Sequence, residues 1–305
     1  MPTPVTLRLG TRGSLLALAQ SNQIAADLRA IHPNLTIEII VVKTTGDLMP
    51  DTPLHDSGGK GLFVKELEQA ILARQIDFAV HSFKDVPVTM PLTEQSNLHI
   101  PAAPKRHDPR DLLISQTAAT LNDLPLSAKI ATGSLRRRCQ LLALRPDLKI
   151  DPIRGNIDTR LKKLRAGKYD AVILAAAGIQ RAGLLEPWMH PIPPDQILPA
   201  PGQGALALQC RRDDPATTAI LKSLDHLPTH RCVTAERQIV EALKGDCHSP
   251  IAALAELSGE EMRIRAAVGG QGGEPPVLLS VSSTPAAVCN DLLQRGAAER
   301  LHPSR

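Results

Sequence analysis

The segment LKGDCHSPIA, residues 243–252, holds a cysteine where it could do chemistry. Cys247 follows Gly245 and Asp246 and precedes Pro250, a composition typical of an exposed loop. Its thiol could be a metal ligand, half of a disulfide, a nucleophile, a covalent anchor or an idle side chain. A zinc site would use further ligands at short spacings, so we expect no metal here. Reactivity or covalent attachment is the favoured interpretation, and an idle cysteine is the alternative.

The other four cysteines follow the apolar periodicity of predicted helices or strands, as small buried side chains do. We expect the core to contain Cys139, Cys210, Cys232 and Cys289. The chain has no Cys-x-x-Cys pair, and its first residues, MPTPVTLRLGTRGS, do not read as an export signal, which favours the reducing cytoplasm. No run of about 18 apolar residues predicts a membrane span.

A lysine and an aspartate directly follow the predicted strand 77–83. Lys84 and Asp85 stand just before Pro87, and ligands bind at the carboxyl ends of strands in open α/β sheets. A carboxylate there could stabilise a cationic intermediate and, if burial raises its pKa, transfer protons. The alternative is a surface charge pair of little consequence. Because strand neighbours face opposite sides, only one of the two would enter a cleft unless the backbone turns.

Two loops rich in small residues predict anion sites. GTRGS (10–14) and ATGS (131–134) each connect a predicted strand to a helix, with a serine at the N-cap position. Backbone N–H groups and the helix dipole at such a junction both favour an anion. Capping alone would explain either loop, but arginines accompany both: Arg12 in the first, Arg136 and Arg137 in the second.

The basic residues are concentrated in one segment. Between Lys129 and Arg165 there are eleven Lys/Arg and three acidic residues, a local charge of +8 in a chain of net charge +4. Such a segment indicates an anionic partner. Aromatic residues make up only 2% of the chain, which leaves almost no stacking platform for single-stranded nucleic acid. Charge alone leaves a duplex-binding module open.

Strands and helices alternate along the chain, which predicts an α/β fold with helices on both faces of each sheet. Predicted strands include 35–42 and the continuous apolar run 171–178. Proline clusters near 101–109 and 187–201 suggest stiff linkers around an inserted domain. We therefore expect domain 1 at 1–100, completed by 200–224, domain 2 at 101–199, and domain 3 at 225–305.

Eight motifs together resemble one family over nearly the whole chain. They are GTRGSLLAL, DTPLHDSGGKGLFVKELE, AVHSFKDVPV, GSLRRRCQL, IRGNIDTRL, LAAAGIQRAG, LPAPGQGALALQCR and VTAERQIVEAL, the last followed by the cysteine loop. Their content and order resemble the porphobilinogen deaminase (hydroxymethylbilane synthase) family. The resemblance implies two doubly wound lobes of the type II periplasmic-binding-protein kind around a hinge cleft, plus a small α+β C-terminal domain.

The resemblance also implies the activity. The family joins four porphobilinogen molecules head to tail, losing ammonia each time, to give hydroxymethylbilane for tetrapyrrole and haem biosynthesis. A dipyrromethane cofactor, fixed by a thioether to the loop cysteine, primes the reaction, so Cys247 would be an anchor. The partners would be porphobilinogen and the growing polypyrrole chain, with no nucleic acid and no membrane, and the protein a cytoplasmic monomer.

Roles follow for residues within the matched motifs. Asp85 would be the catalytic carboxylate, holding pyrrole N–H groups and stabilising the azafulvenium left by ammonia loss. The implied cofactor-binding residues are Lys84, Asp85, Thr132, Ser134, Arg136, Arg137 and, covalently, Cys247. The implied substrate-binding residues are Arg12, Ser14, Lys60, Arg154, Arg160 and Arg181. Their guanidinium groups suit the acetate and propionate carboxylates of each pyrrole.

Two positions depart from the family pattern. Asp246 stands where the family usually has glycine, and a carboxylate there should raise the pKa of the neighbouring thiol and slow cofactor capture. Gly133 replaces a serine and removes one possible hydroxyl contact. Without the resemblance, the first rival interpretation is a solute-binding clamshell for a small anion, which the lack of an export signal disfavours and which gives Asp85 and Cys247 no role. The second is a nucleic-acid-binding protein that uses residues 129–165, which the shortage of aromatic residues and the expected cleft disfavour.

Overall fold

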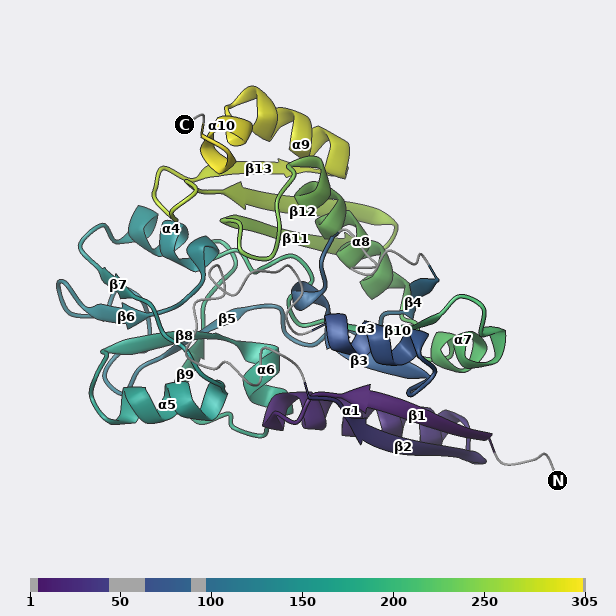
Figure 1. The fold of residues 1–305 in the computed structure, drawn as a ribbon. Helices are drawn as coiled ribbons and strands as arrows, with labels where there is room; N and C mark the ends of the chain where they lie inside the picture. Colours follow the sequence, from purple (N-terminus) through teal and green to yellow (C-terminus); the bar gives the residue numbers. More distant parts are fainter. Residues whose placement is uncertain (1–4, 44–63, 89–96, 304–305) are drawn as a thin grey trace. The chain divides into compact units, whose positions relative to one another are not determined.

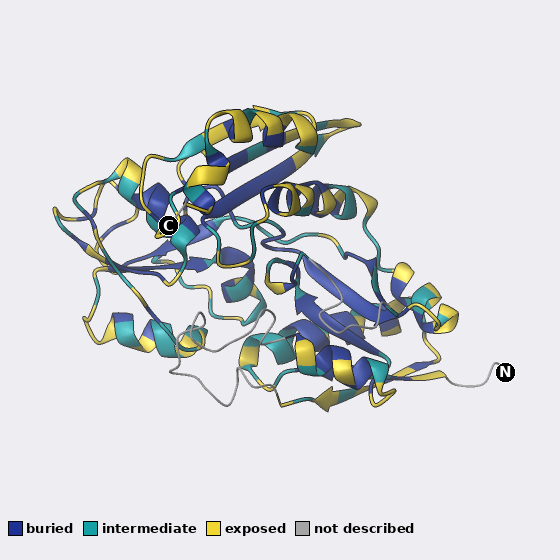
Figure 2. Ribbon diagram, turned by 45° about the horizontal axis from the view of Figure 1, so that its top comes forward, coloured by how far each residue is buried: buried dark blue, intermediate teal, exposed yellow. Residues whose placement is uncertain are grey.

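The chain falls into two compact units in the computed structural model, which describes residues 5–43, 64–88 and 97–303 (Figure 1). Unit 1 comprises Met1–Arg106 and Ala205–His230, and unit 2 comprises His107–Gly204 and Arg231–Arg305. In both units the buried residues are concentrated in the strands and in one stripe of each helix (Figure 2). No helix in the described part of the chain is both long and apolar enough to cross a membrane.

Unit 1 contains a mixed five-stranded sheet of order β2-β1-β3-β10-β4. β1 (Val5–Thr11) lies between β2 (Leu35–Val41) and β3 (Phe78–Ser82) and is parallel to both. β10 (Leu206–Arg211) runs antiparallel to β3 and to β4 (Leu98–Ala102). The strands predicted at 35–42 and 77–83 are confirmed.

Helices cover both faces of this sheet. α1 (Leu15–Ile31) and α7 (Pro215–Lys222) contribute to one apolar cluster, and α3 (Lys65–Leu72) contributes to the cluster on the other face. In α1, Ile24 and Leu28 are fully buried, as their spacing predicts. Ile31, the last residue of α1, has the same spacing but is 49% exposed.

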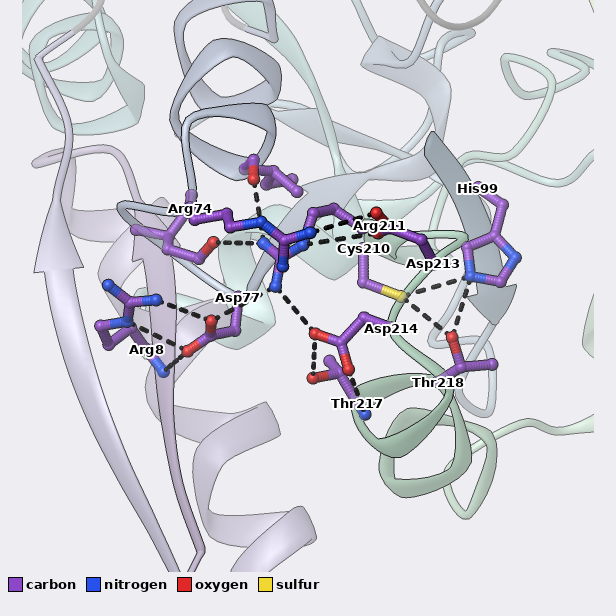
Figure 3. A network of polar contacts seen from close by, with 12 residues as sticks. Arg8, Arg74, Asp77, His99, Cys210, Arg211, Asp213, Asp214, Thr217 and Thr218 are labelled. Atoms are coloured by element: carbon purple, nitrogen blue, oxygen red, sulfur yellow. Dashed lines mark hydrogen bonds and ion pairs between the residues drawn. The ribbon is translucent and has the colours of Figure 1, made fainter. Parts of the chain in front are cut away.

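An ion-pair network supports the sheet of unit 1 at the amino-terminal end of β3 (Figure 3). Asp77, just before β3, accepts hydrogen bonds from Arg8 Nε at 3.1 Å and Nη2 at 2.8 Å. Arg211 of β10 lies 3.6 Å from the same carboxylate and donates to Asp214 at 2.8 Å. These pairs join β1, β3, β10 and α7 at the sheet end opposite to Asp85.

The first sheet of unit 2 repeats the same plan. Its order is β7-β6-β8-β5-β9. β6 (Lys129–Ala131) is parallel to both β7 (Lys149–Asp151) and β8 (Ala171–Ala175). β5 (Asp111–Ile114) is antiparallel to β8 and to β9 (Met189–Pro191). Each of the two sheets thus begins with three parallel strands, and the middle one of these three comes first in the chain. The fourth strand of each sheet is antiparallel to the strands on both of its sides.

Helices cover both faces of this sheet too. α4 (Leu135–Leu144) contributes Leu141 to the cluster on one face, and α5 (Ile157–Arg165) contributes Leu161 to the cluster on the other. The apolar run predicted as one strand at 171–178 is wrong in its second half. β8 ends at Ala175 and α6 (Ala176–Arg181) follows at once, because buried strands and buried helices share the same apolar composition.

The C-terminal part of the chain forms a small sheet with helices. A three-stranded antiparallel sheet has the order β11-β12-β13. The elements are α8 (Leu227–Ala242), β11 (Ile251–Ser258), β12 (Glu261–Val268), β13 (Leu278–Ser282), α9 (Pro285–Gln294) and α10 (Ala297–Leu301). The predicted fold class is confirmed by these strand orders: two doubly wound α/β sheets and a small α+β part. The domain boundaries and the hinge cleft stay predictions.

Candidate active site

In unit 1, the predicted residues gather at one edge of the sheet. β1 and β3 are parallel neighbours, with Leu9 opposite Phe78, so both strands end at the same edge. Arg12 directly follows β1, and Lys84 and Asp85 directly follow β3. A 3₁₀ turn, η1 (Phe83–Asp85), reorients the backbone there, so strand alternation does not separate the two side chains. Asp85 is exposed, whereas Arg12 and Lys84 are half-buried.

Serine caps both helices that follow the small-residue loops, as predicted. Ser14 Oγ accepts the N–H of Ala17 at 3.3 Å at the start of α1. Ser134 Oγ accepts the N–H of Arg137 at 3.4 Å at the start of α4, and the Ser134 N–H donates to the buried Thr132 Oγ1 at 3.2 Å. Each serine hydroxyl can still donate its own hydrogen to another group.

In unit 2, the predicted residues follow three adjacent parallel strands. Thr132 and Ser134 follow β6, Arg154 follows β7, and Arg181 ends the helix after β8. Arg160 lies on α5, where its Nε donates to the carbonyl of Gly155 at 2.8 Å. The carboxyl ends of parallel strands meet at one sheet edge, so the sequence brings these side chains to one side of the domain.

Arg136 and Arg137 are buried around a shared carboxylate. Arg137 donates to Asp111 from Nη2 at 2.7 Å and from Nε at 3.1 Å, and Arg136 Nη1 donates to the same group at 2.9 Å. Arg136 Nη1 also reaches the carbonyl of Leu198, and Gln203 Nε2 donates to Asp111 at 2.8 Å. Two guanidinium groups facing one carboxylate leave a surplus positive charge.

Asp111 is a member of this cluster that the sequence did not predict. Burial alone would raise its pKa, but the charges and hydrogen bonds of Arg136 and Arg137 hold the pKa well below its ordinary value. The signal available in the sequence was weak: an aspartate opening an apolar strand, in Asp111-Leu-Leu-Ile, is out of place in a core. Nothing in the sequence indicated which arginines it would pair with.

Arg181 is a half-buried cation beside neutral groups. Its Nη2 donates to the carbonyl of Gly204 at 2.9 Å, and its buried Nε has no hydrogen-bond partner in the part of the chain that the structure describes. Burial lowers the pKa of this guanidinium to about 10, and no carboxylate of the described residues offsets that effect. A desolvated cation of this kind is stabilised when an anion binds beside it.

The Cys247 loop lies between α8 and β11 and is held by its neighbours. Asp246 Oδ1 accepts the N–H of His248 at 2.9 Å, and the N–H and hydroxyl of Ser249 at 3.0 Å each. Burial would raise the pKa of Asp246, but these hydrogen bonds and the charge of His248 lower it. Cys247 itself is exposed. The loop therefore presents its thiol to solvent on an ordered backbone.

The sorting of the cysteines is confirmed, since the four that follow apolar patterns are buried and Cys247 alone among the five is exposed. Within residues 5–43, 64–88 and 97–303, no group of three His, Cys, Asp or Glu side chains is placed to hold a metal ion. Lys60, predicted to bind substrate, lies outside the described residues, as does the rest of the glycine-rich segment 55–61.

Comparison with known proteins decides the family. Residues 7–219 match the model of the porphobilinogen deaminase dipyrromethane cofactor binding domain, and residues 230–285 match that of the porphobilinogen deaminase C-terminal domain. The chain belongs to the porphobilinogen deaminase family. This confirms the predicted class of enzyme, a transferase of tetrapyrrole biosynthesis, hydroxymethylbilane synthase, with a dipyrromethane cofactor.

Curated relatives agree along most of the chain. The porphobilinogen deaminase of Syntrophus aciditrophicus is 49% identical over 86% of this chain and 85% of its own length. Those of Roseiflexus sp. and Syntrophobacter fumaroxidans are each 45% identical, over 88% and 93% of this chain and 87% and 91% of their own lengths. The similarity therefore extends well beyond the cofactor domain.

Solved structures give a weaker comparison. The BenM effector binding domain with its effector benzoate has a TM-score of 0.44 at 16% identity, covering 78% of this chain and 93% of that one. The periplasmic aliphatic sulphonate binding protein SsuA from Escherichia coli has a TM-score of 0.43 at 16% identity, covering 79% and 71%. Scores below 0.5 carry no argument, so the fold assignment rests on the two strand orders.

The residues of unit 2 fit the carboxylate-bearing cofactor of the porphobilinogen deaminases. Arg136 Nε and Arg181 Nε are buried donors without hydrogen-bond partners in the described residues. The Arg136–Arg137–Asp111 cluster carries surplus positive charge, and the exposed Cys247 lies in the same unit. Unused donors, uncompensated cations and an accessible thiol are the features that a thiol-linked polyanion requires.

Proposed function

We propose that the residues predicted from the sequence carry out the family's reaction in this chain. Four porphobilinogen molecules are joined head to tail to give hydroxymethylbilane. Each addition breaks the C–N bond of an aminomethyl group, releases ammonia, forms a C–C bond and removes a ring proton. The observation that carries this proposal is Arg181, a desolvated cation whose hydrogen bond goes to a neutral carbonyl. It suits a substrate that brings carboxylates.

Cys247 holds the dipyrromethane through a thioether. When bound, the cofactor supplies the pyrrole carbon to which the first substrate unit is joined. Arg136, Arg137, Thr132 and Ser134 bind its carboxylates at the start of α4, where capped backbone and basic side chains favour anions. Lys84 pairs with a further carboxylate. In support, Asp111 neutralises only part of the α4 charge.

Asp85 is the catalytic carboxylate. It is exposed at the end of β3, on a 3₁₀ turn that a rigid strand positions. A carboxylate there accepts pyrrole N–H groups and stabilises the positive charge that develops when ammonia leaves. It stabilises the protonated ring in the same way after the C–C bond forms. To stabilise these two positive charges as they form, the Asp85 carboxylate must be in position before the reaction begins.

The incoming substrate and the growing chain bind through a second set of side chains. These are Arg12, Ser14, Lys60, Arg154, Arg160 and Arg181. Arg12 and Ser14 belong to unit 1, which also carries Asp85, so they suit the docking of each new porphobilinogen. The others suit the carboxylates of the units already joined. Each charge-assisted contact contributes about 1.5–3 kcal/mol.

The same proposal covers the organisation of the protein. We infer a cytoplasmic monomer of three domains, at 1–100 with 200–224, 101–199 and 225–305, that uses neither nucleic acid nor membrane. The small aromatic fraction, 2% of residues, supports the exclusion of single-stranded nucleic acid. The basic segment 129–165 then serves the polypyrrole rather than a phosphate backbone.

Incubation of the purified protein with porphobilinogen tests this function. The proposal predicts hydroxymethylbilane and four ammonia molecules for each product. Arg181→Leu should weaken substrate use at least tenfold, in line with one lost charge-assisted contact. Binding of porphobilinogen without ammonia release would favour the anion-binding clamshell instead, and unchanged kinetics in Arg181→Leu would remove that residue from the site.

A further inference from the structure

A glycine-rich turn approaches α4 more closely than a side chain would allow. The turn follows β12, and a Cβ added at Gly269 would lie 2.5 Å from Cys139 Sγ and 2.6 Å from Cys139 Cβ. Gly273 has a φ of +80° and also lies against α4, since its Cβ would be 2.9 Å from Arg138 Cδ and 3.1 Å from the carbonyl oxygen of Leu135. Figure 1 shows this turn between β12 and β13 reaching α4. The C-terminal sheet thus rests on α4 through glycines.

The same turn is hydrogen-bonded to the segment that carries Cys247. Gly269 donates its N–H to the carbonyl of Pro250 at 3.0 Å, three residues after the cysteine. Immediately beyond, Ile251 pairs with Val268 in the β11–β12 ladder. Gly269 therefore touches α4 with its Cα and holds the Cys247 loop with its amide.

Hydrogen bonds within the turn hold its backbone, so the turn moves as a unit rather than deforming locally. Gly270 donates to the carbonyl of Glu274 at 2.8 Å, and Gly273 donates to that of Gly270 at 2.8 Å. A side chain at Gly269 would thus displace the turn or α4 as a body. Non-bonded carbon atoms have an optimal separation of about 3.5–4 Å, so the turn and α4 would have to move apart by roughly 1 Å.

We propose that Gly269 is a positioning residue for cofactor attachment. It fixes the distance between the Cys247 loop and the α4 arginines, Arg136 and Arg137. This inference rests on the proposed function, in which one covalently tethered group must reach both the thiol and those arginines. A misplacement of about 1 Å can cost roughly a hundredfold in rate when reacting groups must be aligned.

Gly269→Ala tests the inference, with covalent loading as the readout. The full-length apoprotein is incubated with porphobilinogen, and the fraction carrying the dipyrromethane adduct is followed by intact mass. We expect loading at least tenfold slower than in the wild type, at a temperature where the variant is folded. Gly259→Ala is the matched control. Gly259 lies in the β11–β12 turn with a φ of +61°, and a Cβ there would meet nothing within 4 Å.

The control separates positioning from stability. Gly259→Ala strains the same sheet without changing its contact with α4, so it should lower the Tm and still load at the wild-type rate. Adding Cys139→Gly to Gly269→Ala removes both clashing atoms and should return the loading rate to that of Cys139→Gly alone. Loading by Gly269→Ala as fast as by Gly259→Ala, or no rescue by Cys139→Gly, would overturn the inference.

Failure of this inference and failure of the proposed function give different results. If Gly269→Ala loads at the wild-type rate and the wild type carries its adduct on Cys247, only the positioning role is wrong. If the wild type carries no adduct, or carries it on another cysteine, the attachment site itself is wrong and the inference fails with it.

Discussion

Arg137 donates two hydrogen bonds to the Asp111 carboxylate inside unit 2, at 2.7 and 3.1 Å, and both side chains are at least nine-tenths buried. Arg136 adds a third hydrogen bond to the same carboxylate. The arginines that we propose for cofactor binding therefore also support the fold, since Asp111 opens β5, which lies between β8 and β9 in the unit 2 sheet. Variants of these residues must be tested for stability and for cofactor loading separately.

Arg137→Leu should be strongly destabilising. It leaves the Asp111 carboxylate buried with only part of its compensation, and breaking a buried pair costs about 3–5 kcal/mol of unfolding free energy. Chemical denaturation measures the loss. Arg231→Leu is the control, because Arg231 pairs with the exposed Glu260 and its loss should cost less than about 1 kcal/mol. Equal, small losses in both variants would contradict the account.

Acid should remove part of the stability of unit 2 through Asp111. Its pKa is depressed in the folded state, so its contribution is complete above the unfolded pKa of about 3.9 and is lost as pH falls toward the folded value. The unfolding free energy should therefore drop steeply below about pH 4. Asp111→Asn, although less stable at neutral pH, should show a shallower acid dependence. An identical slope in the variant would exclude Asp111 as the source.

Some of this site could be predicted from local pattern and some could not. Ser14 and Ser134 were predictable because an N-cap depends on residues within one helical turn, and Cys247 because it breaks every apolar period around it. Asp111 and Arg136 are 25 residues apart and meet only because β5 and α4 pack together. No periodicity contains that information.

The same contrast holds for the fold. Strands 35–42 and 77–83 were predictable from apolar runs bounded by polar residues. β11 was not predicted, although its residues 251–255 are buried in succession. Its alanines, such as Ala252 and Ala253, have little strand propensity, and pairing with β12 determines their conformation. The close approach of Gly269 to α4 likewise depends on tertiary packing.

Asp246 should have two separable effects on Cys247. Its carboxylate orders the loop through three hydrogen bonds, and its charge opposes formation of the neighbouring thiolate. Asp246→Asn keeps an oxygen acceptor and removes the charge, so iodoacetamide should alkylate the apoprotein severalfold faster at pH 7. Cys247 is the one exposed thiol of five, so native-state alkylation reports on it.

Asp246→Ala completes that comparison. It removes the charge and the acceptor together, so alkylation should also be faster than in the wild type, but dipyrromethane loading should be slower than in Asp246→Asn because the loop is no longer held. Alkylation of Asp246→Asn at the wild-type rate would contradict the charge effect. Equal loading of the two variants would contradict the ordering effect.

Asp85→Asn, once it carries its cofactor, should lose turnover. The substitution keeps the shape of the side chain at the end of β3 and removes the charge that stabilises the cationic pyrrole. Loss of such a preorganised partner costs on the order of a hundredfold or more in rate. Single-turnover consumption of porphobilinogen by the loaded variant measures the loss. Near-normal turnover of the loaded variant would show that Asp85 has no catalytic role.

Arg12→Leu and Arg137→Lys should separate elongation from loading. Arg12→Leu, in unit 1, should carry the adduct and elongate at least tenfold more slowly, in line with one lost charge-assisted contact. Arg137→Lys keeps a buried cation near Asp111 but loses the bidentate geometry, so it should load poorly while remaining folded. Mass spectra before and after addition of porphobilinogen distinguish the two. The reverse assignment would exchange the proposed roles.

The attachment of the cofactor to Cys247 is the centre of this account, and the intact mass of Cys247→Ala tests it most directly. The wild type and a Cys289→Ala control, in which a buried cysteine is replaced, should each carry a covalent two-pyrrole adduct on the peptide containing residue 247. Cys247→Ala should be folded, have the mass of its bare chain and produce no hydroxymethylbilane. An adduct on Cys247→Ala, or on a wild-type peptide that contains a different cysteine, would contradict it.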